Sequence, residues 1–420
     1  MKILISVILF FQLNNAFSQG AKTQTANPYK KLVIAAWKLS SRVSPNPIKL
    51  NYVFDKSFFK LVSEEDTVNI LKKLHSQNGN VVNVTSVTYH SQFSGDFFFQ
   101  TDNGYTIPVS ITVNEQGKIT GLFFRPSFKK EVLLEDAIKN FEELPYKKGL
   151  LIKKFDSLED LSYSLNEKEI FPIASAFKLY ILAYILENNI KWDKVINIKN
   201  DYKSLPSGKM HLYPDGSPVT LFSLAMAMIS ESDNTATDAL IETLGRENIE
   251  EFMKSYNSKP ELNIPLLKTS EMFKLKSSTQ IAADYINSSI KEKRKILKDL
   301  TKIKLEMDSV NFSKPYKTDS IEWFASPEDI CQLMNYFRIK NNEYANAILS
   351  MNPGIDTRTA GYLFAGYKGG SEPGVINMNW LLKSKNGNFY CVSSSAMSPD
   401  ETIDEKKYIS IMQEILNKVP

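Results

Sequence analysis

A serine and a lysine three residues apart, a pair that can form a nucleophile and its base, occur four times in this sequence. On a helix this spacing puts both side chains on one face. A serine hydroxyl becomes a good nucleophile when a base takes its proton, and a lysine can be that base when burial and nearby cations lower its pKa. Ser175 and Lys178 begin a stretch, 174–187, that is apolar almost all round and predicts a buried helix. The other pairs, interpreted as coincidental, are Ser57 with Lys60, Ser127 with Lys130 and Ser288 with Lys291.

Two further polar runs interrupt apolar segments later in the chain. The Ser-Asp-Asn run 232–234 stands between two apolar helical patterns, which indicates a turn between buried helices. Alone, it would equally suit an ordinary helix N-cap. The Lys-Gly-Gly run 368–370 lies on a predicted strand, and alone its glycines would suit a bulge or a close approach of two backbones. The order of the three motifs, more than any one of them, therefore indicates function.

Ser-x-x-Lys, then Ser-Asp-Asn, then a strand carrying Lys-(Thr or Ser)-Gly is the signature set of class A β-lactamases and penicillin-binding proteins. From about Glu135 to its end the chain resembles this family of penicillin-recognising serine hydrolases. The runs Leu-Pro-Ser-Gly at 205–208 and Pro-Asp-Gly at 214–216 add to the resemblance. It implies an α/β (α+β) fold, a three-layer α-β-α domain with an antiparallel sheet.

The resemblance also implies which residues carry the reaction. Ser175 would be acylated, while Lys178 and Ser232 would move protons between the nucleophile and the leaving group. The activity would be that of an exported serine hydrolase that forms an acyl-enzyme with a β-lactam. The three motifs leave open how fast this acyl-enzyme is hydrolysed.

The binding residues implied by the resemblance lie on the second and third motifs. Asn234 would hold a substrate amide, and Lys368 would attract a substrate carboxylate and tune the two proton-moving residues. Gly370 and Ser371 would border the substrate on the same strand. The backbone N–H groups of Ser175 and Ser371 would form an oxyanion hole, aimed at the charge that develops on the attacked carbonyl.

Two positions depart from the family pattern. Gly369 stands where the family has threonine or serine, so a hydroxyl that would contact a substrate carboxylate is lost or is replaced by Ser371. Class A enzymes also use a glutamate in a Glu-Pro-Glu-Leu-Asn-like run to activate the deacylating water, and this chain has Lys259 at that place. Glu261 could act instead only on a shifted loop; the alternative is a surface carboxylate. Glu271 is interpreted as an acid in the first turn of a helix.

Acylation needs only the three motifs, whereas fast turnover needs a base for water, so three functions stay open. The first is β-lactam hydrolysis. The second is a D-Ala-D-Ala peptidase or an esterase that uses the same acyl step. The third is a penicillin-binding protein without turnover, whose N-terminal domain binds a partner.

The elements that must position these residues fall into three segments. Residues 1–18 are expected to be a signal peptide, because Lys2 precedes an apolar run and a small-x-small site ends at Ser18. Residues 19–132 predict a small α+β domain, NTF2-like or cystatin-like in pattern, with helices followed by four strands. Residues 133–420 predict the hydrolase domain. Its expected elements are strands at 149–155, 158–165, 362–368, 375–383 and 388–395, and helices at 135–143, 174–187, 221–229, 235–244, 327–337 and 404–418.

Composition limits the partners. The 420 residues carry 51 basic and 47 acidic side chains, a net charge of +4, so a nucleic-acid partner is not indicated. No apolar stretch reaches the roughly eighteen residues of a membrane span. We therefore expect a periplasmic or secreted protein that acts on a small molecule; the sequence does not indicate its oligomeric state.

The histidines and cysteines give little further indication of chemistry. His75, His90 and His211 are scattered without ligand spacing, so we expect no metal and no cofactor. Cys331 and Cys391 could pair in an oxidising compartment, but the sequence does not give their distance in space. Two separate buried thiols are the slightly favoured expectation.

Overall fold

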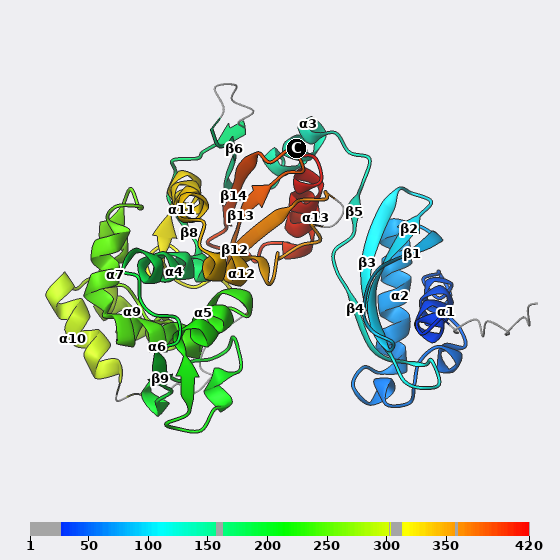
Figure 1. The fold of residues 1–420 in the computed structure, drawn as a ribbon, viewed down its shortest axis with the longest axis horizontal. Coiled ribbons are helices and arrows are strands. Elements are labelled where there is room, and N and C mark those ends of the chain that lie inside the picture. Colours follow the sequence, from blue (N-terminus) through cyan, green and yellow to red (C-terminus); the bar gives the residue numbers. More distant parts are fainter. Residues whose placement is uncertain (1–26, 157–162, 302, 304–312, 358–359, 420) are drawn as a thin grey trace, which may run out of the picture. The chain divides into compact units, whose positions relative to one another are not determined.

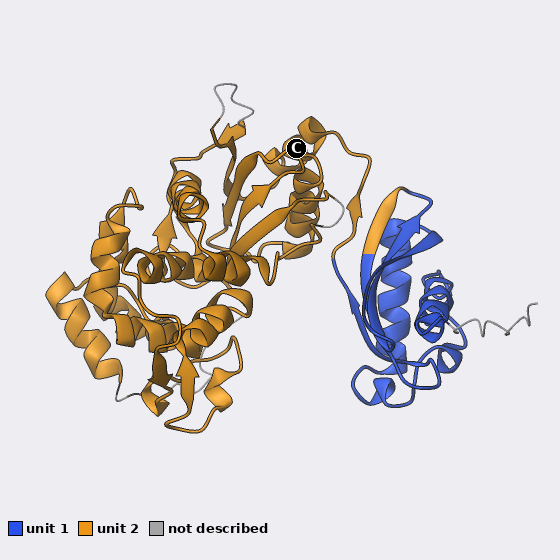
Figure 2. Cartoon of the chain, viewed as in Figure 1, with its two compact units in different colours: residues 1–103, 108–125 blue, residues 104–107, 126–420 orange. Residues whose placement is uncertain are grey.

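The structure, a computed structural model, describes residues 27–156, 163–301, 303, 313–357 and 360–419. The predicted signal peptide lies outside these residues. The chain divides into two compact units (Figure 2). The first comprises Met1–Asn103 with Pro108–Arg125, and the second comprises Gly104–Ile107 with Pro126–Pro420.

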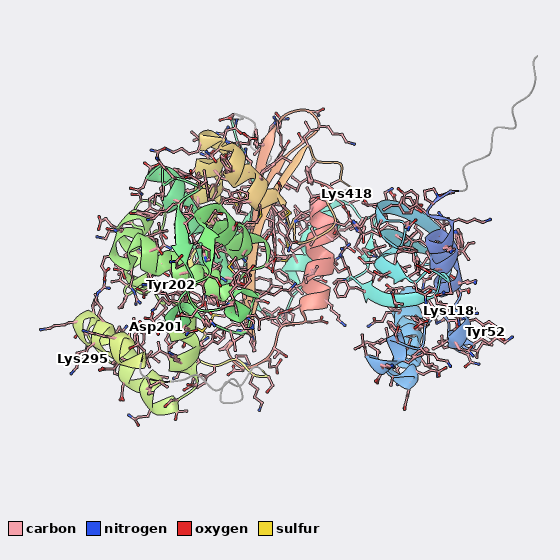
Figure 3. The ribbon with its side chains drawn as sticks, turned by 60° about the horizontal axis from the view of Figure 1, so that its bottom comes forward. Tyr52, Lys118, Asp201, Tyr202, Lys295 and Lys418 are labelled. Carbon is pink, nitrogen blue, oxygen red and sulfur yellow. A yellow bond between two sulfur atoms is a disulfide. The ribbon has the colours of Figure 1, made fainter. Side chains whose placement is uncertain are left out.

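The first unit is an antiparallel sheet in the order β1-β2-β3-β4, with the helices α1 and α2 beside it (Figure 1). α2 begins after Ser63, whose hydroxyl accepts the N–H of Asp66, and ends at Gly79, which has a φ of +89°. Lys118, labelled with Tyr52 in Figure 3, donates a hydrogen bond from Nζ to the carbonyl of Asn51. The NTF2-like or cystatin-like character of this domain stays a prediction. The bounds are α1 Lys30–Ser40, α2 Glu64–Asn78, β1 Val81–Ser91, β2 Ser94–Thr101, β3 Tyr105–Val113 and β4 Ile119–Phe124, with β5 Phe128–Lys129 pairing the start of β3.

The second unit is built on an antiparallel sheet in the order β12-β13-β14-β6-β7. β6 comes from the start of the unit and β12 to β14 from its end, so both ends of the unit complete one sheet. β13 is buried at every position except its last residue, because helices cover both faces of the sheet. The bounds are β6 Lys147–Lys154, β7 Tyr163–Leu165, β12 Phe364–Glu372, β13 Val375–Lys383 and β14 Phe389–Met397.

Alternation along these strands creates two separate cores. Leu150, Ile152 and Trp380 face a core that they share with α3 and α13. Leu151 and Leu381, their neighbours in the sequence, face the opposite core, which they share with α4 and α11. Figure 1 shows the two helical layers on either side of the sheet. The predicted class, an antiparallel sheet between two helical layers, is confirmed.

The larger core surrounds the predicted buried helix. This helix forms as a 3-10 turn, Ala174–Phe177, which continues as α4, Lys178–Glu187. The turn Asn200–Tyr202, with Asp201 and Tyr202 labelled in Figure 3, precedes α5 in the chain. No helix of the described residues is long and apolar enough to cross a membrane. The remaining bounds are α3 Leu134–Glu142, α5 Leu221–Ser230, α6 Asn234–Leu244, α7 Arg246–Met253, α8 Thr269–Lys276, α9 Thr279–Ile286, α10 Ile290–Leu300, α11 Pro327–Lys340, α12 Glu343–Ser350 and α13 Glu405–Leu416, with short strands β8 Phe171–Pro172, β9 Val195–Asn197, β10 Pro218–Thr220 and β11 Phe324–Ala325.

The expectation of two separate thiols is wrong. Cys331 on α11 and Cys391 on β14 form a disulfide, with Cα atoms 5.6 Å apart. The pairing follows from the packing of α11 on the sheet, a contact between distant segments that the cysteine spacing does not reveal. A cross-link over 60 residues stabilises a fold by about 4 kcal/mol in the chain-entropy account.

Candidate active site

A cavity of about 450 Å³ opens beside the start of α4. Ser175 lines this first cavity, together with Asn234 from the start of α6 and Ser371 from β12. A second cavity, of about 300 Å³, is also lined by Ser175 and adds Ser232 and Lys368. The structure therefore brings the three sequence motifs together around one serine.

The turn that carries Ser175 is held by its neighbours. Ala174 has a φ of +42°, a left-handed conformation of the kind that costs a non-glycine residue about 1–3 kcal/mol. Its N–H donates a hydrogen bond of 3.1 Å to the carboxyl group of Glu322. The ring of Phe177 stacks on Trp323, with centroids 3.9 Å apart. These contacts fix the turn with Ser175 at the cavity wall.

Lys178 is fully buried one turn further along the chain. Its Nζ donates hydrogen bonds to the carbonyl of Ser232 at 2.7 Å, to the hydroxyl of Ser232 at 3.2 Å and to Oδ1 of Asn234 at 2.9 Å. Burial, and after it the positive charge of Lys368, lowers the pKa of Lys178 well below its usual value. A lysine with a lowered pKa can take a proton near neutral pH, as a general base must.

Ser232 connects the two lysines. Its hydroxyl accepts hydrogen bonds from Nζ of Lys178 at 3.2 Å and from Nζ of Lys368 at 3.1 Å, and its φ of +55° turns it toward them. Lys368 also donates to the carbonyl of Gly369 at 2.6 Å. Burial lowers the pKa of Lys368 to about 7. We call Lys178, Ser232 and Lys368 the relay side of the site.

The rest of the second motif is both an N-cap and part of the site. Asp233 caps α6 and also accepts the backbone N–H groups of 209–210 at 2.6 and 2.9 Å, which attaches that loop to the motif. Asn234 accepts from Lys178 through Oδ1 and donates from Nδ2 to the carbonyl of Leu205 at 3.1 Å. Its predicted role in holding a substrate amide stays a prediction.

The glycines of the third motif make room for two neighbours. At Gly370 a Cβ atom would lie 2.3 Å from the backbone nitrogen of Ser175, so only glycine lets β12 pass this close to the nucleophile. At Gly369 a Cβ atom would lie 2.1 Å from the hydroxyl of Tyr367. The Tyr367 hydroxyl therefore occupies the space where the family pattern has the start of a threonine or serine side chain.

Tyr367 is a site residue that was not predicted from the sequence. The residue stands two positions before Gly369 and therefore on the same face of the strand, which was the available signal. It lines the second cavity together with Lys368. Burial, and after it the carboxylate of Glu405, raises the pKa of Tyr367, so its hydroxyl keeps its proton at neutral pH.

Ser371 lines both cavities, on the same wall as Ser175. This puts the two residues of the expected oxyanion hole side by side at β12 and the turn before α4. The role of their N–H groups, and the use of the Ser371 hydroxyl in place of the one missing at Gly369, stay predictions.

The structure does not bring Glu261 to the nucleophile. Asn263 of the same 3-10 turn exchanges hydrogen bonds of 2.8 and 2.9 Å with the backbone of Phe324, and this anchor leaves Lys259 and Glu261 exposed. Neither residue is among the described residues that line the two cavities. The surface-carboxylate alternative fits this position. Glu271 lies in the first turn of α8, as predicted.

Three glutamates that were not singled out from the sequence line the first cavity, and two of them lie close together. Glu322 is fully buried, and Glu372 follows Ser371 on β12. Nζ of Lys276 lies 3.9 Å from Glu322 and 2.5 Å from Glu372. The position of Glu372 beside the third motif was a signal, but nothing in the sequence around Glu322 indicated a site. We call Glu322, Glu372 and Lys276 the carboxyl side.

Within the described part of the chain, no group of three or more histidine, cysteine, aspartate or glutamate side chains is arranged to hold a metal ion.

Comparison with known proteins relates the second unit to one family. Residues 133–305 match the family model described as the beta-lactamase enzyme family. No curated protein sequence matches the chain.

Solved structures that match this chain include PBP-A, at 15% identity, and the β-lactamases of Sphaerobacter thermophilus, at 19%, and Chitinophaga pinensis, at 16%. Each comparison covers 68% of this chain and has a TM-score of 0.46. The comparisons cover 94%, 94% and 96% of those three chains, in the same order.

Proposed function

We propose that this chain, a β-lactamase-like serine hydrolase over the matched residues, forms an acyl-enzyme on Ser175 with β-lactams. The observation that carries the proposal is the buried Lys178 with a lowered pKa, hydrogen-bonded to Ser232 and one turn from a serine that opens on a cavity. These are the requirements of an activated serine nucleophile.

Acylation follows from the relay side. As Oγ of Ser175 attacks the carbonyl carbon, its proton passes to the neutral amine of Lys178. The carbonyl oxygen becomes negative and is stabilised by the N–H groups of Ser175 and Ser371. When the C–N bond breaks, the leaving nitrogen takes a proton from the hydroxyl of Ser232, which regains one from Lys178. Lys178 then returns to its neutral form.

Substrate binding would use the cationic end of the second cavity. A protonated Lys368 attracts the carboxylate of a β-lactam. We assign to the Tyr367 hydroxyl the contact with this carboxylate that the family's threonine or serine would make from the position of Gly369. A tyrosine hydroxyl with a raised pKa donates its proton to a carboxylate rather than losing it.

Deacylation is expected to be slow. With Lys259 and Glu261 both exposed, the loop that supplies the water-activating glutamate in class A enzymes leaves the nucleophile without that base. This exposure favours the alternative of a penicillin-binding protein that keeps its acyl group. A D-Ala-D-Ala peptidase or an esterase would use the same acyl step with a different leaving group.

The test is intact-mass measurement after mixing the protein with benzylpenicillin and with a chromogenic cephalosporin. We expect an adduct that persists for minutes or longer on the wild type and is absent from Ser175→Ala. Ser288→Ala, in a pair with the same spacing at the connection between α9 and α10, is the matched control and should be acylated normally. An adduct on Ser175→Ala, or none on the wild type, would contradict the proposal.

We also propose that the protein is exported and acts in the periplasm or outside the cell. The signal-like segment 1–18 and the disulfide between Cys331 and Cys391 both support this, because structural disulfides persist in oxidising compartments. N-terminal sequencing of the mature protein after cell fractionation should find cleavage after Ser18. Retention of Met1 in the cytoplasm would contradict export.

A further inference from the structure

The first cavity has a wall of one charge. Three glutamates line it, and no lysine or arginine does so among the described residues. Two of them, Glu322 and Glu372, belong to the carboxyl side, while the third, Glu405, begins α13 and lines the second cavity as well. Lys276 lies behind this wall and reaches only the carboxyl oxygens. The charged side chains that a ligand meets in this cavity are therefore all carboxyl groups.

Glu322 has one satisfied oxygen and one unsatisfied oxygen. Oε2 accepts the N–H of Ala174 at 3.1 Å and the N–H of Trp323 at 2.9 Å. Oε1 is buried and no N–H group of the described residues reaches it: the nearest ammonium, on Lys276, is 3.9 Å away, and the only group that can bond to it is the neighbouring carboxyl of Glu372, through a shared proton. Leaving a buried polar atom unpaired costs about 1–3 kcal/mol, and more for a charged one. A group with an N–H donor would remove this cost.

The carboxyl side needs a proton to balance its charges. Lys276 is buried and bonds at 2.5 Å to Glu372, so its charge is largely matched by that carboxylate. Burial, and after it the nearby charge of Glu372, raises the pKa of Glu322 well above its usual value. Without a ligand the pair therefore holds a proton. A cationic ligand would take the place of that proton.

The second cavity shows the opposite preference. Lys368 and Tyr367 offer a cation and a donor there, which suits a carboxylate. Ser175 lines both cavities, so a substrate carbonyl at Ser175 would have its leaving portion toward Lys368 and its acyl portion toward Glu322 and Glu372. Glu231 and Glu405 also line the second cavity, and their charges limit the carboxylate position to the neighbourhood of Lys368.

We propose that the preferred acyl donor is zwitterionic, with a primary ammonium group on the acyl portion bound by Glu322 and Glu372 and a carboxylate on the leaving portion bound by Lys368. This inference rests on the proposed acylation of Ser175 and specifies its substrate class. Amino-bearing peptides that end in a carboxylate have this chemistry, as do β-lactams with an amino group on the side chain.

The experiment compares penicillins that differ only in the amino group. The acyl chains are those of ampicillin, with the amine on the α-carbon, and of 4-aminobutanoyl and 6-aminohexanoyl penicillin, with the amine further out. Each is paired with its N-acetyl counterpart, which removes the charge. The second-order rate constant of acylation is measured by intact mass for each probe.

We expect the wild type to acylate with at least one free amine about tenfold faster than with its N-acetyl counterpart, since a charge-assisted hydrogen bond is worth about 1.5–3 kcal/mol and 1.4 kcal/mol is a factor of ten. Two variants should each reduce the ratio of these two rates toward one. They are Glu372→Gln, at a partly exposed position, and Glu322→Gln, which keeps an acceptor oxygen. Glu261→Gln, outside both cavities, is the matched control.

Two results would overturn the inference. One is equal rates for every amine and its N-acetyl counterpart on the wild type. The other is a preference that survives in both glutamine variants. In either case acylation of Ser175 would still be observed, whereas failure of the proposed function itself would appear as no adduct with any probe.

Discussion

The relay side and the carboxyl side flank the same serine and differ in how completely the protein satisfies them. On the relay side Lys178 and Lys368 both donate to the hydroxyl of Ser232 and to nearby backbone carbonyls. On the carboxyl side one buried oxygen of Glu322 is left without a donor. The comparison teaches that one half of the site is assembled to move protons within the protein, while the other is completed by a ligand.

The two sides also have opposite electrostatics. Two buried ammonium groups disfavour each other's charge, which contributes to the lowered pKa of Lys178. Two neighbouring carboxyls do the same with the opposite sign, which contributes to the raised pKa of Glu322. The contributions of the two sides to stability can therefore be distinguished by their pH dependence as well as by mutation.

The largest expected effect breaks the relay side. Lys178→Met keeps the side-chain volume and removes the base, so acylation by benzylpenicillin should fall about 10³–10⁴-fold, toward the upper end of what general base catalysis contributes. Stopped reactions analysed by intact mass give the rate. Lys291→Met, at an exposed position of α10 in a pair with the same spacing, should leave this rate unchanged. Retention of more than a tenth of the rate in Lys178→Met would assign the base elsewhere.

A second expected effect is on stability. Lys368 has a pKa of about 7 when folded and 10.5 when unfolded, so the unfolded chain binds more protons between these values and the wild type gains stability as pH rises through them. Lys368→Met should therefore be more stable than the wild type by roughly 3–5 kcal/mol at pH 6. The gap should narrow by pH 9. Denaturant unfolding at both pH values measures it, and a constant gap would contradict the lowered pKa.

The carboxyl side should change the stability of the protein with pH in the opposite direction. A raised pKa means that folded Glu322 retains a proton that the unfolded chain releases above 4.5, so the wild type loses stability as pH rises from there. Glu322→Gln should gain about 1–3 kcal/mol relative to the wild type at pH 7.5, the range for a buried unpaired polar group, and less at pH 4.5. Parallel curves for the two proteins would show that Glu322 is not protonated in the fold.

The smallest expected effect sharpens the account of the carboxylate end. Tyr367→Phe should slow acylation by benzylpenicillin by about tenfold, as expected for one hydrogen bond to a charged group. An activated ester without a carboxylate should react with both proteins equally. The measured quantity is the ratio of the acylation rates with the two substrates. An equal loss of rate for both substrates would mean that the tyrosine acts only through packing.

The relay side could be predicted from the sequence because its residues lie in three runs whose order is itself a signature. The long apolar patterns around Lys178 and Ser232 also indicated their elements. The carboxyl side could not be predicted. Glu322 reaches the turn that carries Ser175, where it accepts the N–H of Ala174, because β11 pairs with β8. These strands, of two residues each, are too short to show any alternation.

The likeness of one loop to the family's sequence was a misleading guide to its role. The run 259–263 resembles the family's glutamate-bearing segment, but the side chain of Asn263 bonds to the backbone of Phe324 and leaves Glu261 exposed. The disulfide was missed for a related reason, because Cys331 meets Cys391 only once α11 has packed on β14. Each of these features depends on contacts between segments far apart in the chain.

The left-handed residues beside the site limit how this protein can vary. A φ near +50° is poorly tolerated by branched side chains and best tolerated by glycine and asparagine. At Ala174 only the backbone conformation restricts the side chain, so variants with other small residues at this position should survive a selection for activity. At Ser232 both the shape and the hydroxyl are required. Of the two positions, Ala174 is where catalysis could be tuned by selection, and Ser232 is where selection should accept no substitute.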